Sequence, residues 1–290
     1  MENNLWIKGH MAVMRNAPPV SFVHHRSIDK PGNHVLHLNN YIEIYFFIEG
    51  RHRYIVENSL YELSRGDAVV INPREVHKAL PVCEAEYERF YFLVDPRAFD
   101  GMAQNPLADI LKKPSGKDNL ISFPPAVRED VIETLYKISD CYREKKEDLR
   151  AFGHFLHVLD EIGKCLRNGQ AQNGTPASTP KLLESILCYI SENTATINSI
   201  TEIANYLGLT PQYLSSYFSK HIGTSLKHYI QAKRIALAKE LLDGGADVTE
   251  ACYECGFGDC SYFIRVFKRH VGATPLAYKQ RYGNEKQKEG

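Results

Sequence analysis

Two stretches near the C-terminus repeat one pattern, and this duplication constrains the fold more than any other feature of the chain. FSKHIGTSLKHY begins at Phe218, and FKRHVGATPLAY begins 49 positions later, at Phe267. Upstream, TEIANYLG begins at Thr201 and TEACYECG begins 48 positions later, at Thr249. The chain therefore contains two copies of one small structural unit.

Each copy has the residue order of a short helix, a tight turn and a second helix. Gly208 and Gly256 can adopt the left-handed conformation that ends the first helix. Apolar residues four positions apart then predict one buried face on each second helix: Leu214 and Phe218 in the first copy, Phe263 and Phe267 in the second. This is the pattern of a helix-turn-helix, although a helical repeat that binds only proteins would share it.

The opposite faces of the second helices are polar, and we expect them to be exposed. They carry Gln212, Ser215, Ser216 and Lys220 in the first copy, and Ser261, Arg265, Lys268 and Arg269 in the second. Such side chains can reach base edges and phosphates from a helix in a major groove. Between the copies, residues 228–245 predict a long amphipathic helix that holds the two units apart. From Thr210 to Tyr282 there are 10 Lys and Arg against 6 Asp and Glu, which suits a nucleic-acid partner.

Residues 197–282, and above all the segment GFGDCSYFIRVFKRHVGATPLAY, resemble the DNA-binding domain of AraC/XylS family transcription regulators. The resemblance implies recognition helices at Pro211–Lys220 and Cys260–Arg269, which enter successive major grooves of double-stranded promoter DNA. It places the base-reading positions at Gln212, Ser215 and Ser216, and at Cys260, Ser261 and Arg265. Arg265 stands where the first copy has Ser216, and a guanidinium can pair bidentately with guanine. We therefore expect the second unit to make the stronger base contact.

The first hundred residues carry strand signals instead. YIEIYFFIEG, AVVINPREVH and YERFYFLVD are rich in β-branched and aromatic residues and are bounded by turn residues, which predicts a small β-sandwich or barrel. Apolar residues then recur every three or four positions from Val127 to Tyr142 and from Leu149 to Leu166, which predicts two amphipathic helices. These helices either pack on the β domain or form a dimer contact. The expected domains are residues 1–169 with a dimerisation segment at about 125–168, a linker at 170–180, and an all-α domain at 181–290.

The β segment resembles the cupin-like sensor domain of the same family. Cupin enzymes hold a metal with two closely spaced histidines, a glutamate and a later histidine; His37, Glu43 and His77 match, but Asn39 replaces the second histidine. We therefore expect an effector pocket with no metal and no cofactor, the alternative being a metal enzyme. The candidate pocket residues are His37, Tyr41, Glu43, Tyr45, Arg53, His77 and Tyr91. Tyrosines and polar groups of this kind suit a sugar or another small polar metabolite.

Seven cysteines are scattered through the chain without the spacing of a disulfide framework, which favours a reducing cytoplasm. No apolar run approaches the roughly 20 residues of a membrane span, and the N-terminus lacks a signal-peptide pattern. Cys252, Cys255 and Cys260, with His270 nearby, could ligate zinc or form a redox switch. Their positions on a packed helical scaffold explain small apolar side chains equally well.

The sequence thus predicts a ligand-responsive transcription regulator rather than an enzyme. We expect an effector to bind the β domain and to change how a homodimer occupies promoter DNA or contacts RNA polymerase. The sequence is also compatible with two alternatives: a cupin-type metal enzyme fused to a DNA-binding domain, and an architectural DNA-binding protein without a ligand.

Overall fold

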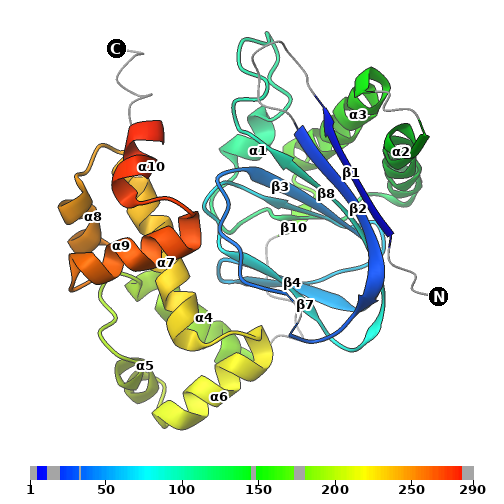
Figure 1. The fold of residues 1–290 in the computed structure, drawn as a ribbon. Helices are drawn as coiled ribbons and strands as arrows, with labels where there is room; N and C mark the ends of the chain where they lie inside the picture. The colour runs from blue at the N-terminus through cyan, green and yellow to red at the C-terminus, as the bar shows by residue number, and fades with distance from the viewer. Residues whose placement is uncertain (1–4, 12–19, 33, 145–147, 173–179, 283–290) are drawn as a thin grey trace. The chain divides into compact units, whose positions relative to one another are not determined.

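The computed structural model describes residues 5–11, 20–32, 34–144, 148–172 and 180–282 of the 290-residue chain (Figure 1). The chain forms two compact units. The first is built on residues 1–34, 39–75 and 79–177, and the second contains residues 178–290. Within the described ranges, no helix is long and apolar enough to cross a membrane.

The first unit contains two antiparallel sheets. Its strands are β1 (Leu5–Met11), β2 (Val20–Asp29), β3 (Ile42–Glu49), β4 (His52–Val56), β5 (Ser59–Glu62), β6 (Ala68–Ile71), β7 (His77–Pro81), β8 (Ala85–Val94), β9 (Leu120–Ile121) and β10 (Ala171–Gln172). The large sheet has the order β1-β2-β8-β3-β6-β9-β10, and the small sheet has the order β5-β4-β7. The pairings in the described part of the chain form a two-sheet sandwich, without the closed ring that a barrel requires.

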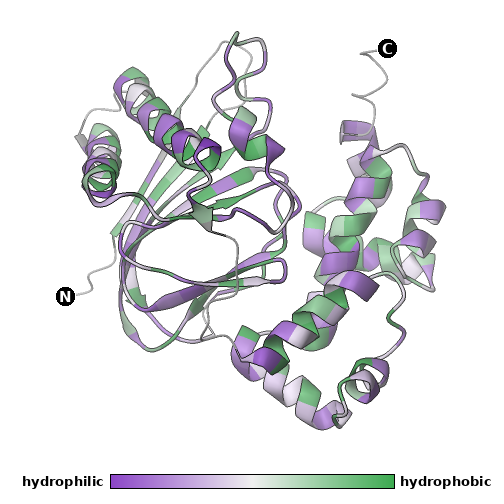
Figure 2. Cartoon of the chain, turned by 180° about the vertical axis from the view of Figure 1, so that it is seen from behind, coloured by the Kyte–Doolittle hydropathy of each residue, from purple (hydrophilic) through white to green (hydrophobic). Residues whose placement is uncertain are grey.

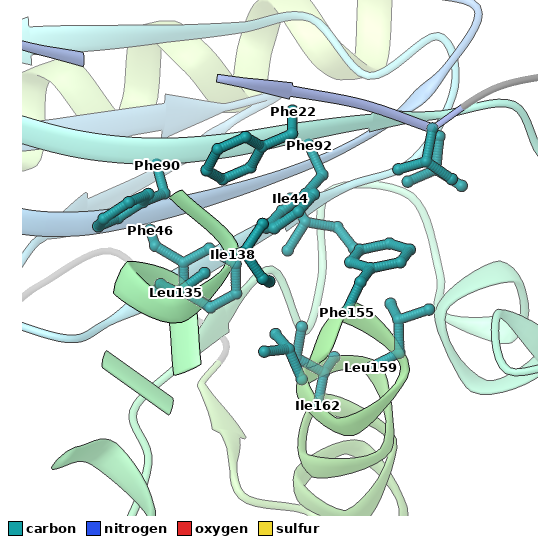
Figure 3. Close-up of a cluster of buried hydrophobic side chains, with 14 of the residues drawn as sticks. Phe22, Ile44, Phe46, Phe90, Phe92, Leu135, Ile138, Phe155, Leu159 and Ile162 are labelled. Carbon is teal, nitrogen blue, oxygen red and sulfur yellow. The ribbon is translucent and has the colours of Figure 1, made fainter. Parts of the chain in front are cut away.

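The described part of this unit also contains the helices α1 (Ala108–Lys112), α2 (Pro125–Glu144) and α3 (Asp148–Arg167). Figure 1 shows α2 and α3 covering one face of the large sheet. Strand alternation sends every second side chain to that face, where the aromatic residues Phe22, Phe46, Phe90 and Phe92 are at most 1% exposed. Figure 3 shows them against Leu135 and Ile138 of α2 and Phe155, Leu159 and Ile162 of α3.

This packing accounts for the apolar faces predicted on the two helices, and the dimer contact stays a prediction. Their apolar stripes are covered by the sheet of the same chain, and a dimer seam made from these stripes would uncover the sheet, at about 1.5–3 kcal/mol for each large side chain exposed there. A buried polar contact adds to the attachment, because Glu88 on β8 accepts hydrogen bonds from Tyr136 of α2 at 2.9 Å and from the His24 ring at 2.7 Å. A homodimer would have to use other surfaces than the stripes we predicted from periodicity. The charged turn predicted between the helices lies largely at residues 145–147, outside the described residues.

The other face of the large sheet packs against the small sheet. The core between them includes Tyr45 and Phe47 of β3, Tyr87 of β8, and Tyr54 and Val56 of β4. Both faces of the large sheet are therefore buried. One buries aliphatic and aromatic side chains under helices, and the other buries several tyrosines.

From Pro180 to Tyr282, the part of the second unit that the structure describes, every regular element is a helix. Its helices are α4 (Lys181–Asn193), α5 (Ile200–Tyr206), α6 (Pro211–Ile222), α7 (Leu226–Asp243), α8 (Val248–Glu254), α9 (Cys260–Val271) and α10 (Pro275–Tyr282). Coloured by hydropathy, the helices of both units carry apolar and polar residues along their length (Figure 2). Helix α7 buries residues on most of its sides, Lys239 among them, so it is not the amphipathic helix that the sequence predicted. The predicted recognition helices are α6 and α9, and the predicted linker helix is α7.

The duplicated sequence folds into duplicated local structure. Gly208 and Gly256 have positive φ of 67° and 92° at the turns that follow α5 and α8. Gly223 and Gly272 end α6 and α9 in the left-handed conformation, with φ of 66° and 81°. The glycines of each copy thus perform the same backbone task, as the repeat predicted.

The predicted linker at 170–180 lies mostly outside the described residues. Its first part is described, and there the structure differs from the prediction, because Ala171 and Gln172 form β10 and pair with β9. Two-residue strands of this kind carry too little sequence periodicity to be predicted.

Candidate DNA-binding and effector sites

Both recognition helices begin at a polar cap that orients their first turn. The Thr210 hydroxyl accepts a hydrogen bond from the backbone N–H of Tyr213 at 3.2 Å, and the Asp259 carboxylate accepts one from that of Tyr262 at 2.5 Å. Such caps satisfy backbone donors that the helix itself cannot pair.

Helix α9 presents the stronger polar face. Phe263, Val266 and Phe267 are fully buried, whereas Ser261, Arg265, Lys268 and Arg269 are exposed. Cys260, the remaining predicted base-reading residue, is only half-exposed. The buried stripe therefore fixes the rotation of α9 and leaves a serine and three cationic side chains facing solvent.

Arg265 has a support that the repeat pattern did not reveal. Its guanidinium carbon lies 5.9 Å from the centre of the Tyr262 ring, a cation–π distance. The Tyr262 hydroxyl in turn accepts a hydrogen bond from the side-chain amide of Gln231 on α7. Tyr262 is thus held from the linker helix and can restrict the directions that Arg265 takes.

Helix α6 buries Leu214 and Phe218, as predicted, and exposes Gln212, Ser216 and Lys220. Ser215 is half-buried. Tyr213 was not predicted to contribute, yet 51% of it is exposed, and its ring lies 5.8 Å from that of Tyr217 one turn along. The exposed face of α6 is therefore neutral and aromatic at its start and cationic only towards its end.

The cysteines beside α9 lie in the helical scaffold. The Cys252 thiol donates to the Phe257 carbonyl at 3.7 Å, and the Cys255 thiol donates to the Cys252 carbonyl at 3.4 Å. Burial raises the pKa of Cys255 to about 12, so this thiol stays protonated and is a poor metal ligand. Among the residues described, the cysteines and His270 form no converging group of metal ligands.

In the first unit, hydroxyl groups meet between the two sheets. The phenol oxygens of Tyr45 and Tyr87 lie 2.9 Å apart, and the Tyr45 and Tyr54 rings are 4.9 Å apart. Burial raises the pKa of Tyr87 to about 12, so the hydroxyl remains a neutral donor and acceptor. Of the predicted pocket residues, Tyr45 is fully buried here and Tyr91 packs against this cluster.

Glu43 lies next to the same cluster and is half-buried. Its carboxylate accepts a hydrogen bond from the Asn39 amide at 2.9 Å and one from the Tyr54 hydroxyl at 3.4 Å. Asn39, which replaces a cupin ligand, is thus a hydrogen-bond donor to the neighbouring acid. This contact suits a polar binding site better than a metal site, because the amide nitrogen that faces Glu43 cannot ligate a cation.

Other predicted pocket residues lie elsewhere. Tyr41 is 43% exposed. Alternation along β4 directs Arg53 to the face opposite Tyr54, away from the hydroxyl cluster. His37 and His77 pair with each other through an isolated antiparallel bridge, with their rings 5.6 Å apart. Tyr41 and Arg53, which we expected to line the pocket, therefore lie apart from the hydroxyl cluster in this structure, and their part in effector binding stays a prediction.

Arg89, like Tyr54 and Tyr87, was not among the predicted pocket residues. Its guanidinium lies over two rings of β8, 5.4 Å from the centre of Tyr87 and 5.1 Å from that of Tyr91, and its Nε atom is buried without a hydrogen-bond partner. Because side chains alternate along a strand, Arg89 and Tyr87 lie on the same face of β8 as Tyr91, which was a predicted pocket residue, and this alternation is the signal that could have identified them.

The chain is similar to known regulators over most of its length. Residues 27–112 match the family model described as an AraC-like ligand binding domain, and residues 203–281 match a helix-turn-helix domain. The HTH-type transcriptional regulator YbfI of Bacillus subtilis is 26% identical over 78% of this chain and 80% of its own length. YijO of Escherichia coli, also an HTH-type transcriptional regulator, is 31% identical over 58% of each chain. A solved structure of ToxT from Vibrio cholerae, bound to an unsaturated fatty acid, aligns over 92% of this chain and 97% of its own, with 15% identity and a TM-score of 0.36.

Proposed function

We propose that this chain, which belongs to the AraC family of transcription regulators, reads promoter DNA mainly through α9 and responds to a small polar effector bound between the sheets of its first unit. Its place among DNA-binding transcription regulators follows from the matches over both units. The observation that carries the division of labour is the exposed Arg265 on a helix whose rotation is fixed by buried Phe263 and Phe267.

In this proposal the two recognition helices have different tasks. Arg265 pairs with a guanine in the major groove, while Lys268 and Arg269 contact phosphates. Helix α6 has Ser216 at the position equivalent to Arg265, so it positions the protein through Gln212, Ser216 and Lys220 and adds less base discrimination.

The effector proposal rests on Tyr45, Tyr54, Tyr87 and Glu43, whose hydroxyl and carboxylate groups meet between the sheets. Such groups hydrogen-bond the hydroxyls of a sugar, and tyrosine rings stack on its apolar face. Arg89 adds a positive charge that can bind a carboxylate or phosphate on the same ligand. We therefore propose a sugar, or a sugar carrying an acidic group, as the effector class.

The proposal extends to partners. A homodimer would place two DNA-binding units on adjacent sites, and effector binding would alter promoter occupancy or contact with RNA polymerase through differential affinity for two arrangements. We propose this role in the cytoplasm, with no enzymatic activity in either unit.

DNA binding is tested with the full chain on an operator selected from random duplexes. Arg265→Ala is expected to weaken specific binding by about 1–3 kcal/mol and to relax one base position, a loss of about 5- to 150-fold in Kd. Lys268→Ala is expected to weaken all sequences alike and to reduce the salt dependence. Arg143→Ala, which removes an exposed cation from α2, is the control. Unchanged operator affinity in both α9 variants would contradict the assignment.

Effector binding is tested by thermal shift of the full chain with neutral sugars, sugar acids and sugar phosphates. A ligand at one hundred times its Kd stabilises the folded unit by about 2.7 kcal/mol. Tyr54→Phe should weaken this response because it removes the hydroxyl that contacts Glu43, while Tyr41→Phe, the same substitution at an exposed position, should not. A response that Tyr54→Phe and Glu43→Gln leave intact would show that the ligand binds elsewhere. Turnover of a sugar by the metal-loaded protein would favour the cupin enzyme.

A further inference from the structure

Three side chains in the first unit converge on one point without any role in the proposals above. The Asp29 Oδ2 atom lies 2.5 Å from Nε2 of His34 and 2.9 Å from Nε2 of His52. All three atoms lie within 4.8 Å of one another. The side chains are 6%, 12% and 2% exposed, respectively.

The three residues come from different parts of the sandwich. Asp29 ends β2 in the large sheet, His52 begins β4 in the small sheet, and His34 belongs to the segment between β2 and β3. An ion held by all three would connect the two sheets directly. The site shares no residue with the cupin ligand positions His37, Glu43 and His77.

Neighbouring groups hold two of these ligands in place. The backbone N–H of Lys30 donates to the second Asp29 oxygen, Oδ1, at 2.9 Å, which leaves Oδ2 directed at the imidazoles. The His52 ring stacks on Tyr87, with centres 4.2 Å apart and an angle of 20° between the planes. Supports of this kind fix the orientation of metal ligands before an ion binds.

The charges suit a divalent cation. Burial opposes ionisation of Asp29, but hydrogen bonds from His34 and His52 outweigh it, and the pKa of Asp29 is lowered. Burial lowers the pKa of His52, so its imidazole is neutral at neutral pH and can offer a lone pair. The Asp29 carboxylate gives the group a negative charge that attracts a dication, and coordination exchanges its hydrogen bonds with His34 and His52 for coordinate bonds.

We propose that Asp29, His34 and His52 bind a divalent transition-metal ion such as Zn²⁺, with water or another small ligand in the remaining position. Imidazole and carboxylate donors suit zinc and its neighbours better than Mg²⁺ or Ca²⁺. Donors about 2.0–2.2 Å from a tetrahedral zinc ion lie about 3.3 Å apart. The two oxygen–nitrogen distances must therefore lengthen by less than about 1 Å from their present values.

The affinity has a structural limit. Coordination through Nε2 places the imidazole proton on Nδ1, and Nδ1 of His52 is buried without a hydrogen-bond partner. Metal-binding histidines usually donate that proton to an acceptor, and losing such support weakens binding by about 10- to 100-fold. We therefore expect a site that exchanges its ion readily, which suits regulation better than permanent structural binding.

The test titrates the chelator-treated full chain with Zn²⁺ by calorimetry and with Co²⁺ by visible absorption. The wild type should bind one ion at this site, without the charge-transfer band of a cobalt–thiolate complex, and its unfolding temperature should rise with Zn²⁺. Asp29→Asn and His34→Ala should each weaken binding at least about tenfold. His157→Ala is a matched control, because it removes an exposed histidine that pairs with Asp130 at 2.6 Å.

Two results would overturn the proposal. One is the absence of Zn²⁺ and Co²⁺ binding to the wild type at submillimolar concentrations, which would make the three residues a purely structural hydrogen-bonded group. The other is equal affinity in the wild type and Asp29→Asn. Asp29→Asn keeps the side-chain shape, and its far-UV circular dichroism is compared with the wild type, so that loss of binding is separated from unfolding.

Discussion

Glu75 provides the sharpest test of what stabilises the first unit. Its side chain and that of Lys113 are each 1% exposed, and the carboxylate accepts from the Lys113 ammonium at 2.9 Å. It also accepts from the backbone N–H groups of Asn72 and Gly116, each at 2.6 Å, and from the Asn119 amide at 3.0 Å. This one acid therefore ties the strand connection after β6 to the segment that leads into β9.

Glu75→Gln keeps the size of the side chain but removes its charge and replaces one acceptor oxygen with a donor NH₂ group. The lost charge-assisted hydrogen bond is worth about 1.5–3 kcal/mol, and a buried N–H left facing other donors costs about 1–3 kcal/mol. The sum agrees with the 3–5 kcal/mol expected when one partner of a buried ion pair is removed. Burial already lowers the pKa of Lys113, so the unpaired ammonium can lose its proton, and we expect a cost near 3 kcal/mol.

Urea unfolding followed by tryptophan fluorescence measures this cost. Trp6 is the only tryptophan and lies in β1 of the same unit, packed against His25 with ring centres 4.1 Å apart and an angle of 37° between the planes. With a urea slope of about 1–3 kcal/mol per molar, a loss of 3 kcal/mol lowers the midpoint by about 1 M or more.

Glu129→Gln is the matched control. Glu129 accepts from Arg65 at 2.8 Å, but the two side chains are 64% and 53% exposed, so its substitution should cost less than about 1 kcal/mol. Equal shifts of the urea midpoint in the two variants would show that burial does not determine how much the Glu75–Lys113 ion pair stabilises the fold.

Two further predictions concern pH and the turns. Burial lowers the pKa of His25 from 6.5 to about 4. The contribution of neutral His25 to the free energy of unfolding is therefore fully present above pH 6.5 and is lost as the pH falls towards 4. His25→Phe keeps a ring against Trp6 and should remove about 1–2 kcal/mol of this acid destabilisation, after allowance for partial solvent screening. Urea midpoints at pH 7 and pH 4.5 measure the difference. Equal losses of stability in the wild type and the variant would refute the role of His25. Gly256→Ala would place a methyl carbon 2.2 Å from the Ala195 carbonyl oxygen at a φ of 92°, so we expect a loss of more than about 2 kcal/mol by thermal unfolding. Gly208→Ala, at the equivalent turn with φ of 67° and no atom within 4 Å, should cost only about 1 kcal/mol; a smaller effect at Gly256 than at Gly208 would contradict the steric argument.

Local patterns predicted the second unit almost completely. Apart from α7, its helices are short and amphipathic, and their ends are marked by glycines and polar caps that act within four residues. Phe263 and Phe267 identify the buried face of α9 by spacing alone, and the exposed position of Arg265 follows from theirs. The support from Tyr262 could not be predicted, because Gln231 lies 31 positions away on another helix.

The first unit was predicted less completely because its contacts join distant segments. Strand alternation indicates that a side chain faces one side of a sheet, but not which side is covered by helices and which by a second sheet. Tyr45 is buried between the sheets, whereas Tyr41 is largely exposed and Arg53 lies on the opposite face of β4 from Tyr54, a difference that the strand pattern alone did not predict. Arg89 contacts the rings of Tyr87 and Tyr91 in its own strand, so strand alternation could have identified it, but only the structure shows that this face of β8 is covered by the small sheet.

The sequence by itself determined the duplicated helix-turn-helix, its exposed cationic helix and the presence of a β-rich first unit, since these depend on periodicity and on residues close in the chain. Only the tertiary structure decided that α2 and α3 use their apolar faces to cover the sheet. It also decided that Tyr45, Tyr54 and Tyr87 share one polar cluster, and that Asp29, His34 and His52 meet across two sheets. The physical reason is the same in each case. Burial and strand pairing select one register among many that the local pattern allows, and the partners of a side chain are set by that register.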